Sequence, residues 1–336
     1  MALLEVKNLR VYFHTREGTV KAVDDVSFTL EKNETLCLVG ESGCGKSVTA
    51  LSIIGLISNP GKIESGQILF EGVDLVKLKK SELRKFRGTE ISMIFQEPMT
   101  SLNPSLKVGF QIVELLLEHF NVSKTEAKNL AVEFLKKVKI PDAVGTYDKY
   151  PHQLSGGMRQ RVMIAMALIS KPSLLIADEP TTALDVTIQL QILELIRDLK
   201  NSLGTSVILI THDMGVVANL ADKVAVMYAG KIVESGEVFE VFENPLHPYT
   251  VGLLGSIPKL DTPKNSRLIS IPGNVPRLIN PPKGCRFHER CSRKLEICEI
   301  AEPPEMTIGN SNHRIACWLY SDEFQGAVDT DERYGS

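Results

Sequence analysis

Three short runs of mostly apolar residues divide the first 240 residues of the chain. They cover residues 35–39, 173–177 and 206–210. Buried parallel strands have this uninterrupted apolar pattern because both faces of their sheet are covered. Each run is followed by polar or glycine-rich sequence, and open α/β sheets bind their ligands at this end of the strands. The pattern therefore predicts an α/β domain with its ligand site at the carboxyl ends of these strands.

Helical spacing of apolar residues replaces this pattern between about residues 98 and 151. Leu115–Leu117 and the amphipathic residues 124–138 are separated by short breaks, which predicts a helical insert over about residues 98–170. Met1–Val6 is expected to form a first strand, and it lacks the cationic and long apolar segments of a signal peptide. No apolar run approaches roughly 18 residues. Neither export nor a membrane-spanning helix is therefore expected.

The last third of the chain has a different composition. Ten of the 17 prolines lie between Pro245 and Pro304, and proline excludes long regular helices because it fixes φ and lacks an N–H donor. We therefore place a domain boundary near residue 240, which separates a domain of residues 1–242 from an extension of residues 243–336. The 336 residues carry a formal net charge of −3 and are 43% hydrophobic, a composition that gives no basic footprint for nucleic acid.

A glycine-rich segment follows the first apolar run directly. Residues 40–47 read GESGCGKS and fit the phosphate-loop pattern G-x-x-x-x-G-K-[ST]. A glycine-rich turn would also have this composition, but the strand before it and the helix expected over about 46–56 favour the phosphate loop. Lys46 would reach the β- and γ-phosphates, and Ser47 would offer its hydroxyl to Mg²⁺. The residues expected to bind the nucleotide are Gly40, Ser42, Gly43, Cys44, Gly45, Lys46, Ser47 and Val48.

The second apolar run ends in two adjacent carboxylates, Asp178 and Glu179. A buried strand normally avoids paired charges, so the presence of two carboxylates at its end indicates a functional role. Asp178 is suited to hold Mg²⁺ through water, and Glu179 is suited to polarise the water that attacks the γ-phosphate. This segment alone would be read as a solvated turn. Together with the phosphate loop it predicts nucleotide hydrolysis.

A third motif, Ser155-Gly156-Gly157, opens a helix that continues to about Leu168. Ser155 is a good N-cap, and the helix N-terminus would provide a second anion site. These motifs, with Ala183-Leu184-Asp185 and Thr211-His212-Asp213, occur in the order and spacing of ATP-binding cassette ATPases. The chain resembles that family from about Leu3 to Phe242.

The resemblance implies roles for further residues. Gln96 would contact Mg²⁺ and the attacking water, His212 would contact the γ-phosphate and steady Glu179, and Asp185 would communicate across a dimer. Phe13, favoured over Tyr12 by strand register, would stack on adenine. In this family Ser155, Gly156 and Gly157 complete the site of the other subunit in a head-to-tail dimer. That partner is either a second copy of this chain or a paralogous ATPase, and we expect the paralogue.

The segments Asn244–Thr250 and Gln96–Pro104 resemble the oligopeptide and dipeptide importer branch of this family. The resemblance implies an ATPase at the cytoplasmic face of the cell membrane, peripheral to it. Its partners would be integral membrane permease subunits and, indirectly, an external substrate-binding protein. The cargo, a dipeptide, an oligopeptide or nickel, is left open. The alternative is a soluble cassette ATPase acting on DNA, ribosomes or cluster assembly, but no long coiled-coil insertion or second cassette is present.

Four cysteines fall in the extension, separated by 5, 6 and 18 residues: Cys285, Cys291, Cys298 and Cys317. A C-x₂-C pair typical of zinc ribbons is missing, so four thiolates holding a 4Fe-4S cluster are the favoured interpretation. Zinc, or thiols that are free or disulfide-bonded, are the alternatives. A structural clip is the expected role of the cluster, with redox sensing as the other possibility.

Overall fold

The computed structural model describes residues 2–97, 101–182, 184–256, 271–309 and 312–322. Pro98 and Ala183, which belong to motifs discussed above, lie outside these ranges. The strands are β1 (Leu4–Thr15), β2 (Gly18–Leu30), β3 (Thr35–Val39), β4 (Gly61–Phe70), β5 (Val73–Asp74), β6 (Ile91–Ile94), β7 (Leu174–Asp178), β8 (Ser206–Thr211), β9 (Lys223–Tyr228), β10 (Lys231–Glu237), β11 (Glu305–Thr307) and β12 (Arg314–Ala316).

These strands form two sheets. The larger sheet has eight strands in the order β11-β12-β10-β9-β3-β8-β7-β6, and the smaller has four in the order β2-β1-β4-β5. The central strands β9, β3, β8, β7 and β6 pair in parallel. Every residue of β3, β7 and β8 is buried, because the sheet is covered on both faces. The three apolar runs in the sequence are therefore neighbouring central strands.

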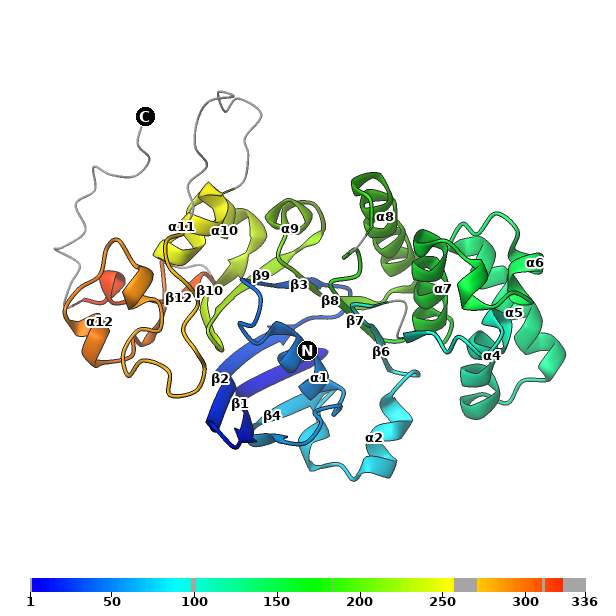
Figure 1. Ribbon diagram of the computed structural model, residues 1–336, viewed down its shortest axis with the longest axis horizontal. Helices are drawn as coiled ribbons and strands as arrows, with labels where there is room; N and C mark the ends of the chain where they lie inside the picture. The colour runs from blue at the N-terminus through cyan, green and yellow to red at the C-terminus, as the bar shows by residue number, and fades with distance from the viewer. Residues whose placement is uncertain (1, 98–100, 183, 257–270, 310–311, 323–336) are drawn as a thin grey trace.

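Most helices pack on or beside the larger sheet, whereas α2 lies beside the smaller one (Figure 1). They are α1 (Lys46–Ile53), α2 (Lys80–Phe86), α4 (Val108–His119), α5 (Lys124–Lys137), α6 (Ala143–Tyr147), α7 (Gly156–Leu168), α8 (Val186–Leu203), α9 (Met214–Leu220), α10 (Val238–Glu243), α11 (Pro248–Gly255) and α12 (Ile297–Ile300), with 3₁₀ turns at Leu75–Lys77, Pro151–Gln153, His288–Arg290 and Trp318–Tyr320.

The helical insert lies at the end of the molecule beyond β6 and β7. Helices α4, α5, α6 and α7 lie together there (Figure 1). The start of α5 is fixed by local sequence. Ser123 accepts a hydrogen bond from the Glu126 N–H at 3.2 Å, while the Glu126 carboxylate accepts from the Ser123 N–H at 2.8 Å. This capping box satisfies two otherwise unpaired N–H donors and sets the start of the helix.

The extension joins the larger sheet and does not form a separate layer. Strand β12 pairs antiparallel with β10, Glu234 opposite Ile315, and β11 pairs with β12. Tyr249 and Phe287 of the extension belong to the same hydrophobic cluster as the central strands. The expected boundary at residue 242 falls inside α10. Within the described part of the chain, no helix is long and apolar enough to cross a membrane.

Candidate nucleotide site

The phosphate loop lies between the end of β3 and the start of α1, tightly packed against two other strands. A Cβ on Gly40 would lie 2.1 Å from the backbone oxygen of Met227 in β9, and a Cβ on Gly45 would lie 2.3 Å from that of Ala22 in β2. Gly40 has φ 149° and Gly45 has φ 107°, values that favour glycine. The two glycines are therefore required both by backbone conformation and by space.

Lys46 is buried at the first turn of α1 and lies inside the loop. Its Nζ donates to the backbone oxygens of Gly40 at 2.7 Å and Glu41 at 3.1 Å. Cys44 is also buried, and burial raises the pKa of its thiol. At neutral pH this thiol is protonated, so it acts as a small apolar group in the loop and is not an activated nucleophile.

Ser47 and Asp178 meet at the end of the phosphate loop. The Ser47 hydroxyl donates to Asp178 Oδ1 at 3.0 Å. Burial raises the pKa of Asp178, and the neighbouring carboxylate of Glu179 raises it further. A hydroxyl beside a buried carboxylate is the hard oxygen set that Mg²⁺ prefers, and a cation there would offset the unfavourable burial of negative charge. The residues present therefore fit a magnesium ion.

Glu179 is held by three side chains. Its Oε2 accepts from Gln96 Nε2 at 2.8 Å and from the Thr182 hydroxyl at 2.9 Å, and its Oε1 lies 3.3 Å from His212 Nδ1. Burial raises the pKa of Glu179, but the hydrogen bonds from Thr182 and His212 outweigh burial, and the net shift is downward. Glu179 itself has φ 44°, a left-handed conformation that the loop after β7 imposes.

This grouping follows from the order of the strands. Gln96 follows β6, Glu179 follows β7 and His212 follows β8, and these three parallel strands are adjacent in the sheet. Their carboxyl ends meet at one edge, beside the phosphate loop after β3. Sequence reasoning missed Thr182, because a threonine three residues after a carboxylate carries no signal that separates it from an ordinary turn residue.

Ser155, Gly156 and Gly157 lie in a different part of the molecule from the phosphate loop. Ser155 caps α7 by accepting from the Met158 N–H at 3.4 Å, and α7 packs against α4, α5 and α8. Helix α1 packs instead against β1, β2 and β7, so the two motifs occupy different parts of the molecule (Figure 1). Ser155 and Gly156 are exposed, as is Asp185 at the start of α8.

The two aromatic candidates in β1 have different surroundings. The Tyr12 hydroxyl donates to Asp24 Oδ1 at 2.6 Å, so its polar end is already bonded to β2. Phe13 is half-buried, and a Cβ on Gly61 would lie 2.6 Å from its ring. Stacking of adenine on Phe13 stays a prediction.

Comparisons with known proteins agree with this geometry. A family described as "ABC transporter" matches residues 23–182, and one described as "Oligopeptide/dipeptide transporter, C-terminal region" matches residues 233–298. An oligopeptide transport ATP-binding protein of Bacillus subtilis is 56% identical over 94% of this chain and 88% of its own length. This chain belongs to the ABC transporter ATP-binding family, in its oligopeptide/dipeptide branch.

Other relatives within the family agree. A dipeptide transport ATP-binding protein of Bacillus subtilis is 53% identical over 97% of both chains. The dimeric post-hydrolysis structure of the ATP-binding cassette MJ0796 bound to ADP and Pi is 27% identical, with a TM-score of 0.64, and covers 70% of this chain and 98% of its own. CbiO1 of Clostridium perfringens, part of an ABC transporter complex, is 30% identical with a TM-score of 0.61 over 72% and 91%. The ABC ATPase fold expected from the sequence is confirmed.

The predicted iron–sulfur cluster is contradicted. Over the described ranges, no group of three or more His, Cys, Asp or Glu side chains is arranged to hold a metal ion. Cys285, Cys291, Cys298 and Cys317 are free thiols. Burial raises the pKa of Cys285 to about 11 and that of Cys317 to about 12, so both are protonated at neutral pH. Cys285 and Cys291 pack as small apolar side chains against the main core, and Cys317 does so in a smaller apolar cluster. Cysteine spacing alone does not separate this use from metal binding.

Proposed function

We propose that this chain is the ATP-hydrolysing subunit of a membrane importer for dipeptides or oligopeptides. The observation that carries the proposal is the position of Glu179. Its carboxylate is held by Gln96, Thr182 and His212, directly after the Asp178 that bonds Ser47 of the phosphate loop. The relatives are named as oligopeptide and dipeptide transport proteins, and a soluble role unconnected to a permease is not favoured.

In this proposal the residues of one subunit bind the phosphates and orient the water. Lys46 and the N–H groups of the phosphate loop, from Gly43 to Val48, bind the β- and γ-phosphates. Ser47 and Asp178, with Gln96, hold Mg²⁺, which supplies positive charge against the phosphate oxygens. Glu179 is ionised at neutral pH because its pKa is lowered, so it accepts a hydrogen bond from the attacking water. His212 positions Glu179.

The second half of each site comes from another subunit. Ser155 and Gly156 are exposed at the start of a helix that packs away from α1. Their N–H groups and the helix dipole suit a phosphate presented from outside, and the similar cassette MJ0796 is described as dimeric. We therefore place a second ATPase subunit, a paralogue or another copy, across Ser155, Gly157 and Asp185.

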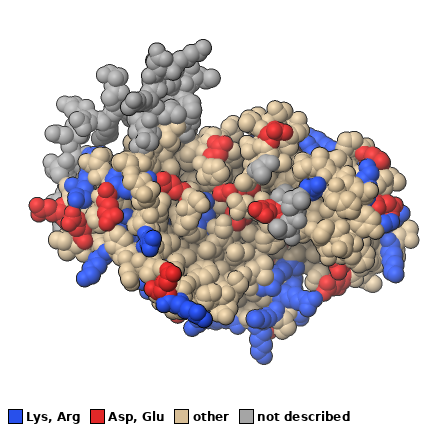
Figure 2. Space-filling model, in the orientation of Figure 1, with Lys and Arg blue, Asp and Glu red and all other residues tan. Residues whose placement is uncertain are grey.

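Attachment to the membrane is proposed through a permease. Exposed apolar side chains occur on the helical insert and beside Gln96: Phe95 is 38% exposed, Phe110 50% and Val144 61%. Such side chains suit contact with the cytoplasmic parts of a permease. Figure 2 shows basic side chains gathered over α2 and others toward both ends of this face, with acidic side chains spread among them. This mixed surface supports a protein partner and not nucleic acid.

Two substitutions test the assignment of roles. Glu179→Gln keeps the shape of the side chain, so we expect ATP affinity to be retained and hydrolysis to fall by roughly 10²–10⁴-fold. Lys46→Ala removes the main phosphate cation, so we expect ATP binding itself to be lost. Glu118→Gln, which alters an exposed ion pair with Arg84, is the matched control and should behave as the unaltered protein.

ATP binding is measured by titration calorimetry, and hydrolysis by phosphate release. The assembled permease, reconstituted in vesicles with its binding protein, then tests peptide uptake. Full hydrolysis by the Glu179→Gln protein would remove the role of Glu179. Absence of uptake by an assembly that hydrolyses ATP normally would refute the peptide cargo.

A further inference from the structure

The extension holds the phosphate loop at its second residue, Glu41. The Glu41 N–H donates to the hydroxyl of Tyr249 at 2.9 Å. The Glu41 carboxylate accepts from Arg290 Nη1 at 2.6 Å and Nη2 at 3.0 Å. Main chain and side chain of one loop residue are therefore bonded by two residues that follow it by 208 and 249 positions in the sequence.

Both anchoring side chains are fixed in place. Tyr249 is 0% exposed, and its ring packs against those of Tyr228 and Phe287, with centroids 4.7 and 5.4 Å away. Arg290 is 7% exposed and also donates from Nε to the backbone oxygen of Pro272 at 2.7 Å. The Glu41 side chain is 30% exposed, but both of its partners are buried and held by the extension, so the contact differs from a pair of mobile surface side chains.

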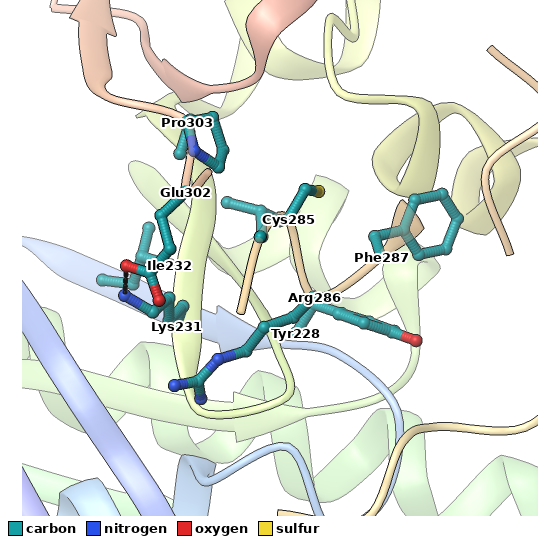
Figure 3. Close-up of a pocket in the computed structure, with 11 residues that line it drawn as sticks. Tyr228, Lys231, Ile232, Cys285, Arg286, Phe287, Glu302 and Pro303 are labelled. Atoms are coloured by element: carbon teal, nitrogen blue, oxygen red, sulfur yellow. Dashed lines mark hydrogen bonds and ion pairs between the residues drawn. The ribbon is translucent and has the colours of Figure 1, made fainter. Parts of the chain in front are cut away.

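A second set of hydrogen bonds connects the extension to the same loop, through the turn between β9 and β10. Arg286 is buried, pairs with Asp24 of β2 and donates to the Ala229 backbone oxygen. The next residue, Gly230, donates its N–H to the backbone oxygen of Cys44 at 2.9 Å. Figure 3 shows Arg286 extending away from Cys285 beneath β10, at the edge of a cavity of about 40 Å³.

The charge of Glu41 explains why this arrangement bears on nucleotide binding. A free carboxylate at the second position of the loop would repel the phosphates that the loop gathers. Arg290 neutralises it with a bidentate pair, the strongest form of such a contact. The pKa of Arg290 is raised, first by its hydrogen bond to Glu41, so the guanidinium stays charged at neutral pH.

We propose that Tyr249 and Arg290 are positioning residues of the ATP site, through which the extension sets the affinity of the phosphate loop for nucleotide. The coupling is reciprocal, because a ligand that favours the held loop must also favour the docked extension. The inference rests on the proposed ATPase function and adds a regulatory role for the extension. Anything that loosens the extension lowers ATP affinity, and ATP tightens its docking.

Two variants test the electrostatic part. Arg290→Gln leaves the Glu41 carboxylate unpaired near the phosphates, so we expect the Kd for ATP to rise about 10-fold or more. Adding Glu41→Gln to Arg290→Gln removes that charge, so affinity should recover by several-fold. A purely structural role of Arg290 would give no recovery, because the second substitution restores none of its bonds to the extension.

Tyr249→Phe tests the hydroxyl while keeping the ring in its packing. We expect the Kd and KM for ATP to rise about 3–10-fold, as for one lost hydrogen bond, with kcat changed less than about 2-fold. Tyr320→Phe is the matched control, because its hydroxyl donates to the Leu246 backbone oxygen at 3.0 Å within the extension and does not reach the loop. Its ATP affinity should be that of the unaltered protein.

Hydrogen exchange of the full chain tests the reciprocal effect. ATP should slow amide exchange over residues 285–300 in the unaltered protein and in Tyr320→Phe, and much less in Tyr249→Phe. Unchanged ATP affinity in both Tyr249→Phe and Arg290→Gln would overturn the proposal. Failure of the ATPase assignment is a different result, namely no ATP binding by the unaltered protein.

Discussion

Glu234 is a buried carboxylate on β10 whose removal should detach the extension. Its side chain is 0% exposed. It accepts hydrogen bonds from the N–H groups of Leu246 at 2.8 Å and His247 at 2.9 Å, and it lies 2.7 Å from His313 Nε2. One side chain therefore joins β10 to the start of the extension and to the segment before β12.

Glu234→Ala leaves the buried N–H groups of Leu246 and His247 without their acceptor and removes the carboxylate beside His313. Each unsatisfied buried donor costs about 1–3 kcal/mol, so the two N–H groups together predict a loss of roughly 2–6 kcal/mol, to which the cavity left by the side chain adds. Glu302→Ala is the matched control. Its carboxylate also joins the extension to β10, through Lys231 at 2.6 Å, but it is 47% exposed, and an exposed pair contributes about 0–1 kcal/mol.

Urea unfolding followed by tryptophan fluorescence measures both variants. The chain has a single tryptophan, Trp318, which lies in the extension and donates to the Ala301 backbone oxygen at 3.0 Å. Its fluorescence therefore reports the extension directly. A loss below about 1 kcal/mol in Glu234→Ala, or a loss equal to that of Glu302→Ala, would refute the reasoning from buried donors.

Two further predictions concern assembly and pH. In the slowly hydrolysing Glu179→Gln variant, ATP should produce a dimer that light scattering detects, either of this chain by itself or with the paralogous subunit. Adding Ser155→Arg should abolish that dimer. Dimers that form equally well with Ser155→Arg would rule out the cross-subunit site. Burial lowers the pKa of His247 from 6.5 to about 4. The unfolded chain therefore binds a proton that the folded one does not between these values, and stability should fall by up to roughly 3 kcal/mol as pH drops from 6.5 to 4. His247→Asn, which can still accept from the Tyr249 N–H, should flatten the Trp318-monitored pH profile, and an unchanged slope would contradict this assignment.

Local pattern was sufficient for three of the central strands, β3, β7 and β8, and for the phosphate loop. Residues 35–39 form β3 as expected, and α5 covers Lys124–Lys137, one residue short of the expected range. Such elements can be predicted because burial on both faces of a sheet, and on one face of a helix, leaves a periodic mark in the sequence. The grouping of Gln96, Glu179 and His212 followed from the family resemblance, and the strand order β8-β7-β6 gives its physical reason.

The extension was decided by tertiary structure. Its strand β12 joins β10 although 76 residues separate β10 (ending at Glu237) from β12 (beginning at Arg314), and no local pattern encodes which edge such a short strand adds to. The cysteine spacing suggested a metal cluster, yet Cys285 and Cys291 pack against the main core and Cys317 lies in a smaller apolar cluster. Cysteine suits either role, and only the surrounding side chains decide between them. The bonds from Tyr249 and Arg290 to Glu41 are likewise invisible in the sequence. They depend on charges and donors that come together only when the extension docks beside the phosphate loop.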